Sequence, residues 1–284
     1  MTTKTLRAGR YATTTPATHT ARAPLYRATR AEATRLNRLS FAGAGGVLLT
    51  FFALMASVIT FFAADGGGRM GGVAVDLESV GGLVAGLAWA VDLMGIVVLA
   101  LWAAATASDY STGLVRILVQ AQPRRARLLG GKLVALTAYT VAGTAVATLA
   151  AVAAAPLLAG AKGISTSAWF PGFAETLVTV LGAWVNLTLS VLVWGVIGLS
   201  VATVTRSLTI AIAGGIGYLL VFERLLGLVA DQATTYLPGS VLSAVAAGGT
   251  ASLSYGAALV LAATYAAGAL LLAALVFTRR DVTS

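Results

Sequence analysis

Cysteine is absent from the 284-residue sequence, and histidine occurs once, as His19. Without cysteine the chain forms no disulfide and offers no thiolate for a zinc or iron–sulfur site. The single histidine lies in a polar N-terminal stretch, so no Ser–His pair can form in an apolar interior. These absences argue against an intramembrane enzyme and remove most catalytic arrangements from consideration.

Charged residues are scarce as well. They make up 10% of the chain, against roughly 25% in an ordinary soluble domain. Hydrophobic residues make up 58% of the sequence, and its mean hydropathy is +0.89. This composition predicts an integral membrane protein.

The sequence contains several long runs of apolar residues. A membrane-crossing helix needs about 20 apolar residues, and continuous runs argue against a β-barrel, whose strands alternate. We therefore predict an all-α membrane protein with six transmembrane helices. The fifth run is short and is expected to end at the far interface near Glu223. The six runs cover residues 41–64, 81–106, 133–159, 176–202, 207–222 and 255–277.

The distribution of basic residues predicts the orientation. If the N-terminus is cytoplasmic, sixteen of the 19 Lys and Arg residues lie on the cytoplasmic side, as the positive-inside rule requires. The charge then faces anionic lipid headgroups, so the basic pI of 10.4 does not call for nucleic acid. The predicted parts are a disordered cytoplasmic tail (1–23), a basic interfacial helix (24–40), the transmembrane domain (41–278) and a cytoplasmic C-terminal tail (279–284).

A charged stretch, "DYSTGLVRILVQAQPRRARLLGGKL", separates the second and third runs and starts at Asp109. Its first half has the pattern of a short helix that Ser108 or Asp109 would cap. Pro123 would end this helix, because the residue before a proline is pushed out of the α region. A short helix on a cytoplasmic loop is suited to docking a soluble partner.

This stretch resembles the signature of type-2 ATP-binding-cassette (ABC) exporter permeases, in the actinobacterial form. The family usually has Glu where this chain has Asp109. Weaker similarities are the basic helix before the first run, which fits the family's elbow helix, "YLPG" at 236–239 and the ending "FTRRDV". The residues that carry the resemblance are Asp109, Tyr110, Thr112, Gly113, Arg116, Pro123, Arg124, Arg125 and Lys132.

The resemblance implies a coupling helix over 109–120 that rests on a nucleotide-binding subunit. It also implies short re-entrant helices on the outer side between the fifth and sixth spans. Arg124, Arg125 and Arg127 are expected to bind lipid and enforce topology, or to contact the partner. The residues expected at the subunit contact are Asp109, Tyr110, Thr112, Gly113, Leu114, Arg116 and Ile117.

No phosphate-binding loop occurs around Lys132, because the G-x-x-x-x-G-K-[ST] pattern is missing there. The chain is therefore expected to bind no cofactor and to be no enzyme itself, with ATP and Mg on a separate ATPase subunit. The expected assembly is two permeases and two ATPase subunits in a bacterial plasma membrane. A C2 homodimer is the simplest form, and pairing with a different permease is the alternative.

Asp92 lies inside the second apolar run, where an ionised carboxylate costs several kcal/mol. Asn186 is its best expected partner, with Tyr139 and Thr140 as others. One interpretation is a hydrogen bond between packed helices. The other places Asp92, Trp89 and Asn186 on the substrate path of an exporter for an amphipathic drug, lipid or peptide-like natural product.

Two other classes remain open from the sequence. A secondary transporter would use intramembrane ionisable groups and broken helices, often in inverted repeats. Only Asp92 lies well inside a run, and no internal repeat is clear. A membrane scaffold without an ATPase partner is the second alternative.

Overall fold

The computed structural model describes residues 29–30, 32–34, 39–63, 76–113, 125–229 and 234–279. Several sequence predictions fall outside these ranges, namely the tails 1–23 and 280–284, most of the interfacial helix 24–40, and Leu114, Arg116, Ile117 and Arg124. Arg125 and Arg127 begin a described helix, but their side chains are outside the described part.

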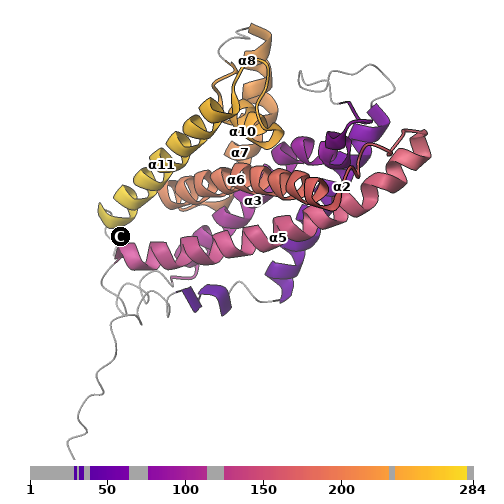
Figure 1. Cartoon of the computed structure of the whole chain (residues 1–284). Coiled ribbons are helices and arrows are strands. Elements are labelled where there is room, and N and C mark those ends of the chain that lie inside the picture. Colours follow the sequence, from indigo (N-terminus) through magenta and orange to yellow (C-terminus); the bar gives the residue numbers. More distant parts are fainter. Residues whose placement is uncertain are drawn as a thin grey trace, which may run out of the picture.

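Every regular element among the described residues is helical (Figure 1). The long helices are α2 (Leu39–Ala63), α3 (Ala85–Ser111), α5 (Arg125–Lys162), α6 (Phe173–Thr205) and α11 (Tyr255–Arg279). A 3-10 segment, η2 (Val80–Val84), leads into α3. A second group consists of α7 (Leu208–Ile216), the π-helical segment η3 (Gly217–Phe222), α8 (Glu223–Val229) and α10 (Pro238–Ala247).

Five helices are long and apolar enough to cross a membrane: Gly43–Ala63, Val80–Ser111, Leu128–Lys162, Phe173–Thr205 and Tyr255–Arg279. The shortest of these stretches has 21 residues, about 32 Å at 1.5 Å per residue, which matches the hydrocarbon core of a bilayer. The predicted all-α architecture is confirmed, and the helices indicate a membrane-embedded protein. Five of the six predicted runs lie in these helices.

The long helices α2, α3, α5 and α6 alternate in direction and so define two ends of the molecule (Figure 1). Helices α3 and α6 begin at one end, and α2 and α5 finish there. Because α10 also lies at this end, we call it the α10 end. At the other, the Lys132 end, α3 and α6 finish and α5 begins. A side chain in α3 can therefore lie near either end, depending on its position along the helix.

Helices α3 and α6 form the centre of the bundle through reciprocal contacts of tryptophan and glycine. Trp194 of α6 lies against Gly95 of α3, and Trp102 of α3 lies against Gly195 of α6. A Cβ atom at Gly195 would lie 2.7 Å from the Trp102 ring. Both tryptophans are buried. The missing side chains thus let two large rings pack between closely spaced helices.

The second apolar run extends further as a helix than its hydropathy predicts. We predicted an end at Thr106 and a cap for a new helix at Ser108 or Asp109, and this is wrong. Both residues lie in the last turns of α3, which continues to Ser111. The Ser108 hydroxyl donates to the carbonyl of Ala105, 3.3 Å away, within the same helix. Polar side chains end the apolar sequence pattern near Thr106. The helix continues past it because backbone hydrogen bonds do not require apolar side chains.

The fifth apolar run also continues past its predicted end. Helical backbone runs from Leu208 through η3 and α8 to Val229. Glu223 was expected to mark the end of this helix; it begins α8 instead. The carboxyl group is accommodated because α10 supplies hydrogen-bond donors to it. The apolar helix in this part, Leu208–Leu219, is shorter than the five long ones.

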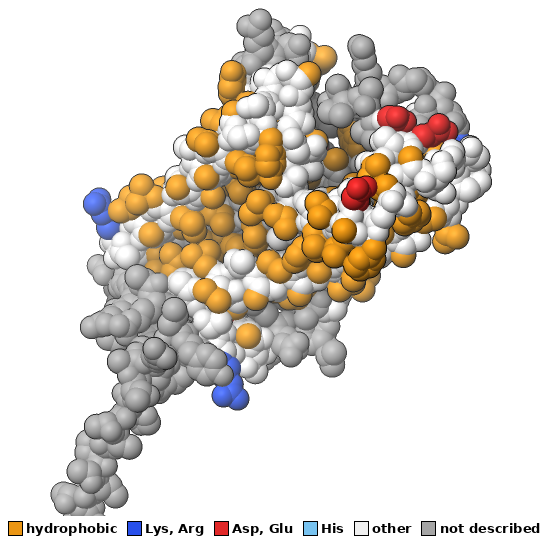
Figure 2. Space-filling model, in the orientation of Figure 1, with side chains coloured by type: hydrophobic (Ala, Val, Ile, Leu, Met, Phe, Trp, Pro, Cys, Tyr) orange, Lys and Arg blue, Asp and Glu red, His pale blue; other side chains and the backbone are white. Residues whose placement is uncertain are grey.

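The surface of the bundle is apolar around its middle. Figure 2 shows hydrophobic side chains across the centre of one face, with Lys and Arg atoms at its left and lower margins and Asp and Glu atoms at the upper right. Val146 and Leu149 of α5 are 57% and 66% exposed, and Leu271 of α11 is 61% exposed. Such exposure of large aliphatic side chains is unfavourable in water and fits a lipid-facing surface.

Candidate functional site

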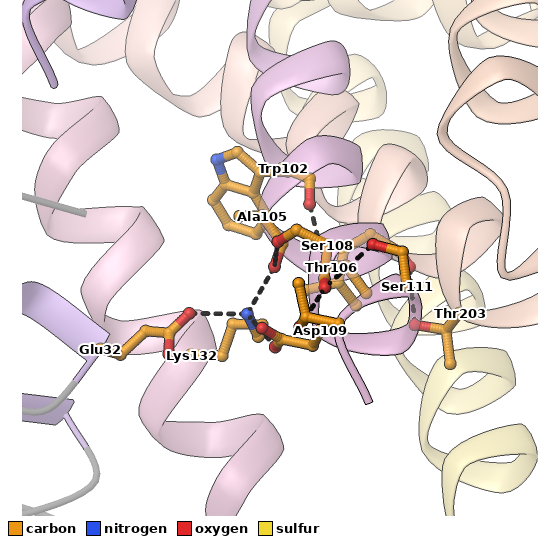
Figure 3. Close-up of polar contacts among 11 residues, drawn as sticks. Glu32, Trp102, Ala105, Thr106, Ser108, Asp109, Ser111, Lys132 and Thr203 are labelled. Atoms are coloured by element: carbon orange, nitrogen blue, oxygen red, sulfur yellow. Dashed lines mark hydrogen bonds and ion pairs between the residues drawn. The ribbon is translucent and has the colours of Figure 1, made fainter. Parts of the chain in front are cut away.

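One partly buried lysine joins three segments at the Lys132 end of the bundle (Figure 3). The Nζ atom of Lys132 lies 2.6 Å from Oε1 of Glu32 and 2.8 Å from Oδ2 of Asp109. It also donates to the backbone carbonyl of Ala105, 2.8 Å away. An ammonium group has three donors, and each has an acceptor here. We call Glu32, Asp109 and Lys132 the Lys132 cluster.

The Lys132 cluster is shielded from solvent. Side-chain exposure is 11% for Lys132, 10% for Glu32 and 6% for Asp109. Glu32 belongs to the short N-terminal helical stretch, Asp109 to the end of α3 and Lys132 to the first turns of α5. The cluster therefore fixes the N-terminal segment against the two helices that flank the charged loop.

The turn after α3 contains the exposed part of the resembling motif. Thr112 ends the helix, and its hydroxyl donates to the carbonyl of Ser108 at 2.7 Å. Gly113 follows with a φ of 69°, a left-handed conformation that glycine adopts without steric cost. Ser111, Thr112 and Gly113 are all exposed. Asp109 thus points into the protein while the next turn faces outward.

Tyr110 has a separate contact with the end of α6. The guanidinium carbon of Arg206 lies 5.6 Å from the centre of the Tyr110 ring, within the range of a cation–π interaction. Arg206 follows α6 directly and has a φ of 55°. The start of the motif is thus connected to α6 through Tyr110 and to α5 through Asp109.

A cavity of about 990 Å³ lies toward the α10 end of the bundle. Residues of α3, α6, α8, α10 and the 250–253 turn contribute to its wall. Trp89, Asp92 and Asn186, the three residues that sequence analysis assigned to a substrate path, all line it. They are partly exposed rather than buried. The cavity's size is at the upper end of the range for small-molecule sites.

Asp92 is positioned by a residue that sequence analysis missed. The hydroxyl of Ser243 in α10 donates to Oδ1 of Asp92 at 3.0 Å. Asn186, the expected partner, instead accepts a 2.6 Å hydrogen bond from the Tyr255 hydroxyl at the start of α11. Thr140, another expected partner, accepts from Nε1 of Trp102. Ser243 is 151 residues away from Asp92, so no local pattern pointed to it.

Glu223 is a second carboxyl group of the same cavity, and it was also missed. Its Oε1 accepts from the backbone N–H of Ser240 at 2.7 Å and from the Ser240 hydroxyl at 3.0 Å. Its Oε2 accepts from the Gly239 N–H at 3.2 Å. These N–H groups belong to the first turn of α10, where unpaired donors and the helix dipole favour a negative group. The "PGS" sequence of residues 238–240 was the available signal, since proline favours a helix start.

The electrostatics at Glu223 reflect two opposing effects. Burial raises the pKa of the Glu223 carboxyl above its ordinary value, and the charge of Asp92 acts in the same direction. The hydrogen bonds from Ser240 and Gly239 lower the pKa and offset part of this change. The two carboxyl groups therefore influence each other across the cavity.

Helix α10 connects both carboxyl groups through one face. Ser240 contacts Glu223, and Ser243, three residues later, contacts Asp92. Residues three apart lie on the same side of a helix. On α6, Ser190 donates to the carbonyl of Leu242 at 2.9 Å. These polar contacts fix α10 as one wall of the cavity.

Within the described ranges, no group of three His, Cys, Asp or Glu side chains is placed to hold a metal ion. Neither a comparison with models of known protein families nor one with curated proteins finds a match for this chain. Two sites therefore guide the assignment of function: the Lys132 cluster with its exposed turn, and the cavity at the α10 end.

Proposed function

We propose that the chain is the transmembrane subunit of a type-2 ABC exporter. In this proposal a separate ATPase subunit binds ATP and Mg, and the permease moves an amphipathic drug, lipid or peptide-like natural product outward across a bacterial plasma membrane. The segment from Leu208 to Phe222 is the fifth of six crossings, and α10 is a short outer re-entrant helix. Both termini, and hence the Lys132 end, face the cytoplasm.

One observation carries the proposal: a single helix, α3, reaches from the cavity to the exposed turn. Asp92 lines the cavity and Asp109 belongs to the Lys132 cluster. Their separation along the helix axis is about 26 Å at 1.5 Å per residue. A partner that displaces the turn at Thr112 and Gly113 would also move the wall of the cavity. This is the mechanical connection that an ATP-driven permease needs.

The Lys132 cluster gives that connection its stiffness. Lys132 holds the end of α3 to the start of α5 and to Glu32 through charged contacts. Because these groups are shielded from water, separating them would cost the attraction between opposite charges in a poorly solvated place. Force on the exposed turn is therefore transmitted to the helices instead of being lost by fraying at their ends. The assembly we propose is two copies of this chain with two ATPase subunits.

A test compares two glycines with the same backbone conformation. Gly113 and Gly163 both have a φ of 69°, and a Cβ atom at either would meet no atom within 4 Å. Valine at each position costs about 1–2 kcal/mol in backbone strain. Gly113 lies in the proposed contact with the ATPase subunit, whereas Gly163 lies at the other end of α5.

The measurement is substrate-stimulated ATP hydrolysis by the permease co-expressed with a P-loop ATPase encoded beside it. We expect Gly113→Val to abolish the stimulation and Gly163→Val to retain it, with both variants inserted in the membrane at comparable levels. Equal stimulation for the two variants, or no association between the chain and any such ATPase, would refute the proposal.

A secondary transporter is the second candidate, and the two carboxyl groups of the cavity favour it. Asp92 and Glu223 would then take up and release protons as substrate moves. Uptake or extrusion driven by a pH gradient in vesicles that contain only this chain distinguishes the two mechanisms. The exporter proposal predicts no such transport without the ATPase.

A further inference from the structure

The charged side chains in the described lining of the cavity at the α10 end are of one sign. Asp92 and Glu223 contribute carboxyl groups, and none of the described lining residues is Lys, Arg or His. The two groups come from different helices, α3 and α8, so their convergence is a property of the fold and not of one acidic sequence. Within the described lining, these two carboxyl groups therefore favour a positively charged ligand over a negatively charged one.

The rest of the wall is suited to an organic molecule and not to a bare ion. Leu87, Leu219 and Leu253 contribute aliphatic surface, and Trp89 is the aromatic residue among the described lining residues. An indole face attracts cations, above all quaternary ammonium groups that carry apolar substituents. The volume of about 990 Å³ accommodates a drug-sized ligand.

The hydrogen bonds from α10 orient the two carboxyl groups and bring no positive charge to them. Ser243 on Asp92, and Ser240 and Gly239 on Glu223, are neutral donors. They hold the carboxyl groups to one face of α10, at a fixed separation. A neutral donor lowers the cost of an ionised carboxylate but leaves its field in the cavity.

We infer that the cargo of this cavity is an amphipathic organic cation, held between the Asp92 and Glu223 carboxylates and against the Trp89 ring. The inference rests on the proposed function in one respect, that the cavity is where cargo binds. It narrows the cargo from amphipathic molecules in general to those with a positive charge, and it excludes anionic lipids.

Tetraphenylphosphonium and tetraphenylborate test this inference, because they have nearly the same size and apolar surface but opposite charge. The experiment is equilibrium dialysis of radiolabelled tetraphenylphosphonium against the purified full-length chain in detergent, with empty micelles as background. We expect saturable binding of the cation that tetraphenylborate does not displace. Removing one carboxylate charge should weaken binding by roughly tenfold, the effect of about 1.4 kcal/mol of lost attraction.

Three variants make the result specific. Asp92→Asn and Glu223→Gln preserve shape and remove one charge each from the cavity. Glu175→Gln removes the same charge from an exposed position in the first turn of α6, outside the lining, and should bind like the wild type. If Glu223→Gln fails to fold because α10 loses its acceptor, the affinity of Asp92→Asn relative to the wild type tests the inference by itself.

Absence of saturable binding, wild-type affinity in Asp92→Asn, or equal binding of the anion would each overturn the inference. The assay contains no ATPase, so its outcome is independent of the proposed mechanism. If the chain binds the cation but associates with no ATPase, the inference about the cargo stands and the exporter proposal is refuted. ATP-driven export of neutral or anionic amphiphiles with no cation binding would do the reverse.

Discussion

At the scale of single residues, Lys132 is the most consequential charge in the described part of the chain. Its ammonium group balances two shielded carboxylates and a backbone carbonyl. Replacing Lys132 by Met would remove this ammonium group from Glu32 and Asp109 while both carboxylates stay shielded. We expect a loss of about 3–5 kcal/mol, the range for breaking a buried ion pair from one side.

The matched variant is Lys162→Met, at the other end of the same helix. Lys162 lies 4.8 Å from the centre of the Phe62 ring at a partly buried position, where a cation–π interaction contributes about 0.5–2 kcal/mol. Free energies of unfolding from titration with sodium dodecyl sulfate give the comparison. Similar losses for Lys132→Met and Lys162→Met would contradict a stabilising role for the cluster.

Residues also show where sequence reasoning reached its limit. The polarity of Asp92 marked it as a candidate site, and the structure does place it in a cavity. Its donor Ser243 and the second carboxyl group, Glu223, come from distant parts of the chain. Nothing in the local pattern around a serine in "GSVLSAV" distinguishes it from an ordinary helical serine. The contact exists only once α10 packs against α3.

At the scale of elements, the close approach of α3 and α6 depends on glycine. A Cβ atom at Gly198 would collide with the backbone of Leu99, which cannot move aside as a flexible side chain can. We expect Gly198→Ala to push the helices apart and to cost about 1–3 kcal/mol, the range for overpacking a core.

Gly268→Ala in α11 is the matched control for this prediction. A Cβ atom there meets nothing within 4 Å, so alanine should add about 0.5–1 kcal/mol of stability through its higher helix propensity. Thermal unfolding in detergent, followed by tryptophan fluorescence, measures both variants. An unfolding midpoint for Gly198→Ala that equals or exceeds that of the wild type would show that the helices are not held by close backbone contact.

The elements themselves were largely predictable. Continuous apolar runs gave five long helices at nearly the right positions, because burial in lipid requires the same residues that a hydropathy pattern detects. Helix ends were less predictable. Helix α3 extends to Ser111 and includes Asp109, which pairs with Lys132. The segment after Phe222 remains helical and includes Glu223, which accepts hydrogen bonds from α10. Both residues have their partners elsewhere in the chain.

At the scale of the whole molecule, the proposed orientation can be tested with two single cysteines. The sequence has no native cysteine, and Ser111 and Ser167 are both exposed, at opposite ends of the bundle. We expect Ser111→Cys to react with an impermeant maleimide only after the membrane is opened. Ser167→Cys should react in intact cells, and the reversed pattern would show that the N-terminus lies outside.

The Lys132 cluster also sets an order of events during synthesis. Glu32 leaves the ribosome 100 residues before the lysine that binds it. At about 5–20 residues per second, roughly 5–20 seconds pass before Lys132 leaves the ribosome as well. During that interval α2 and α3 enter the bilayer while both carboxylates of the cluster still lack their cation. The first two helices therefore lack this link at the Lys132 end until α5 begins to emerge, and an arrest of translation before Lys132 would leave them without it.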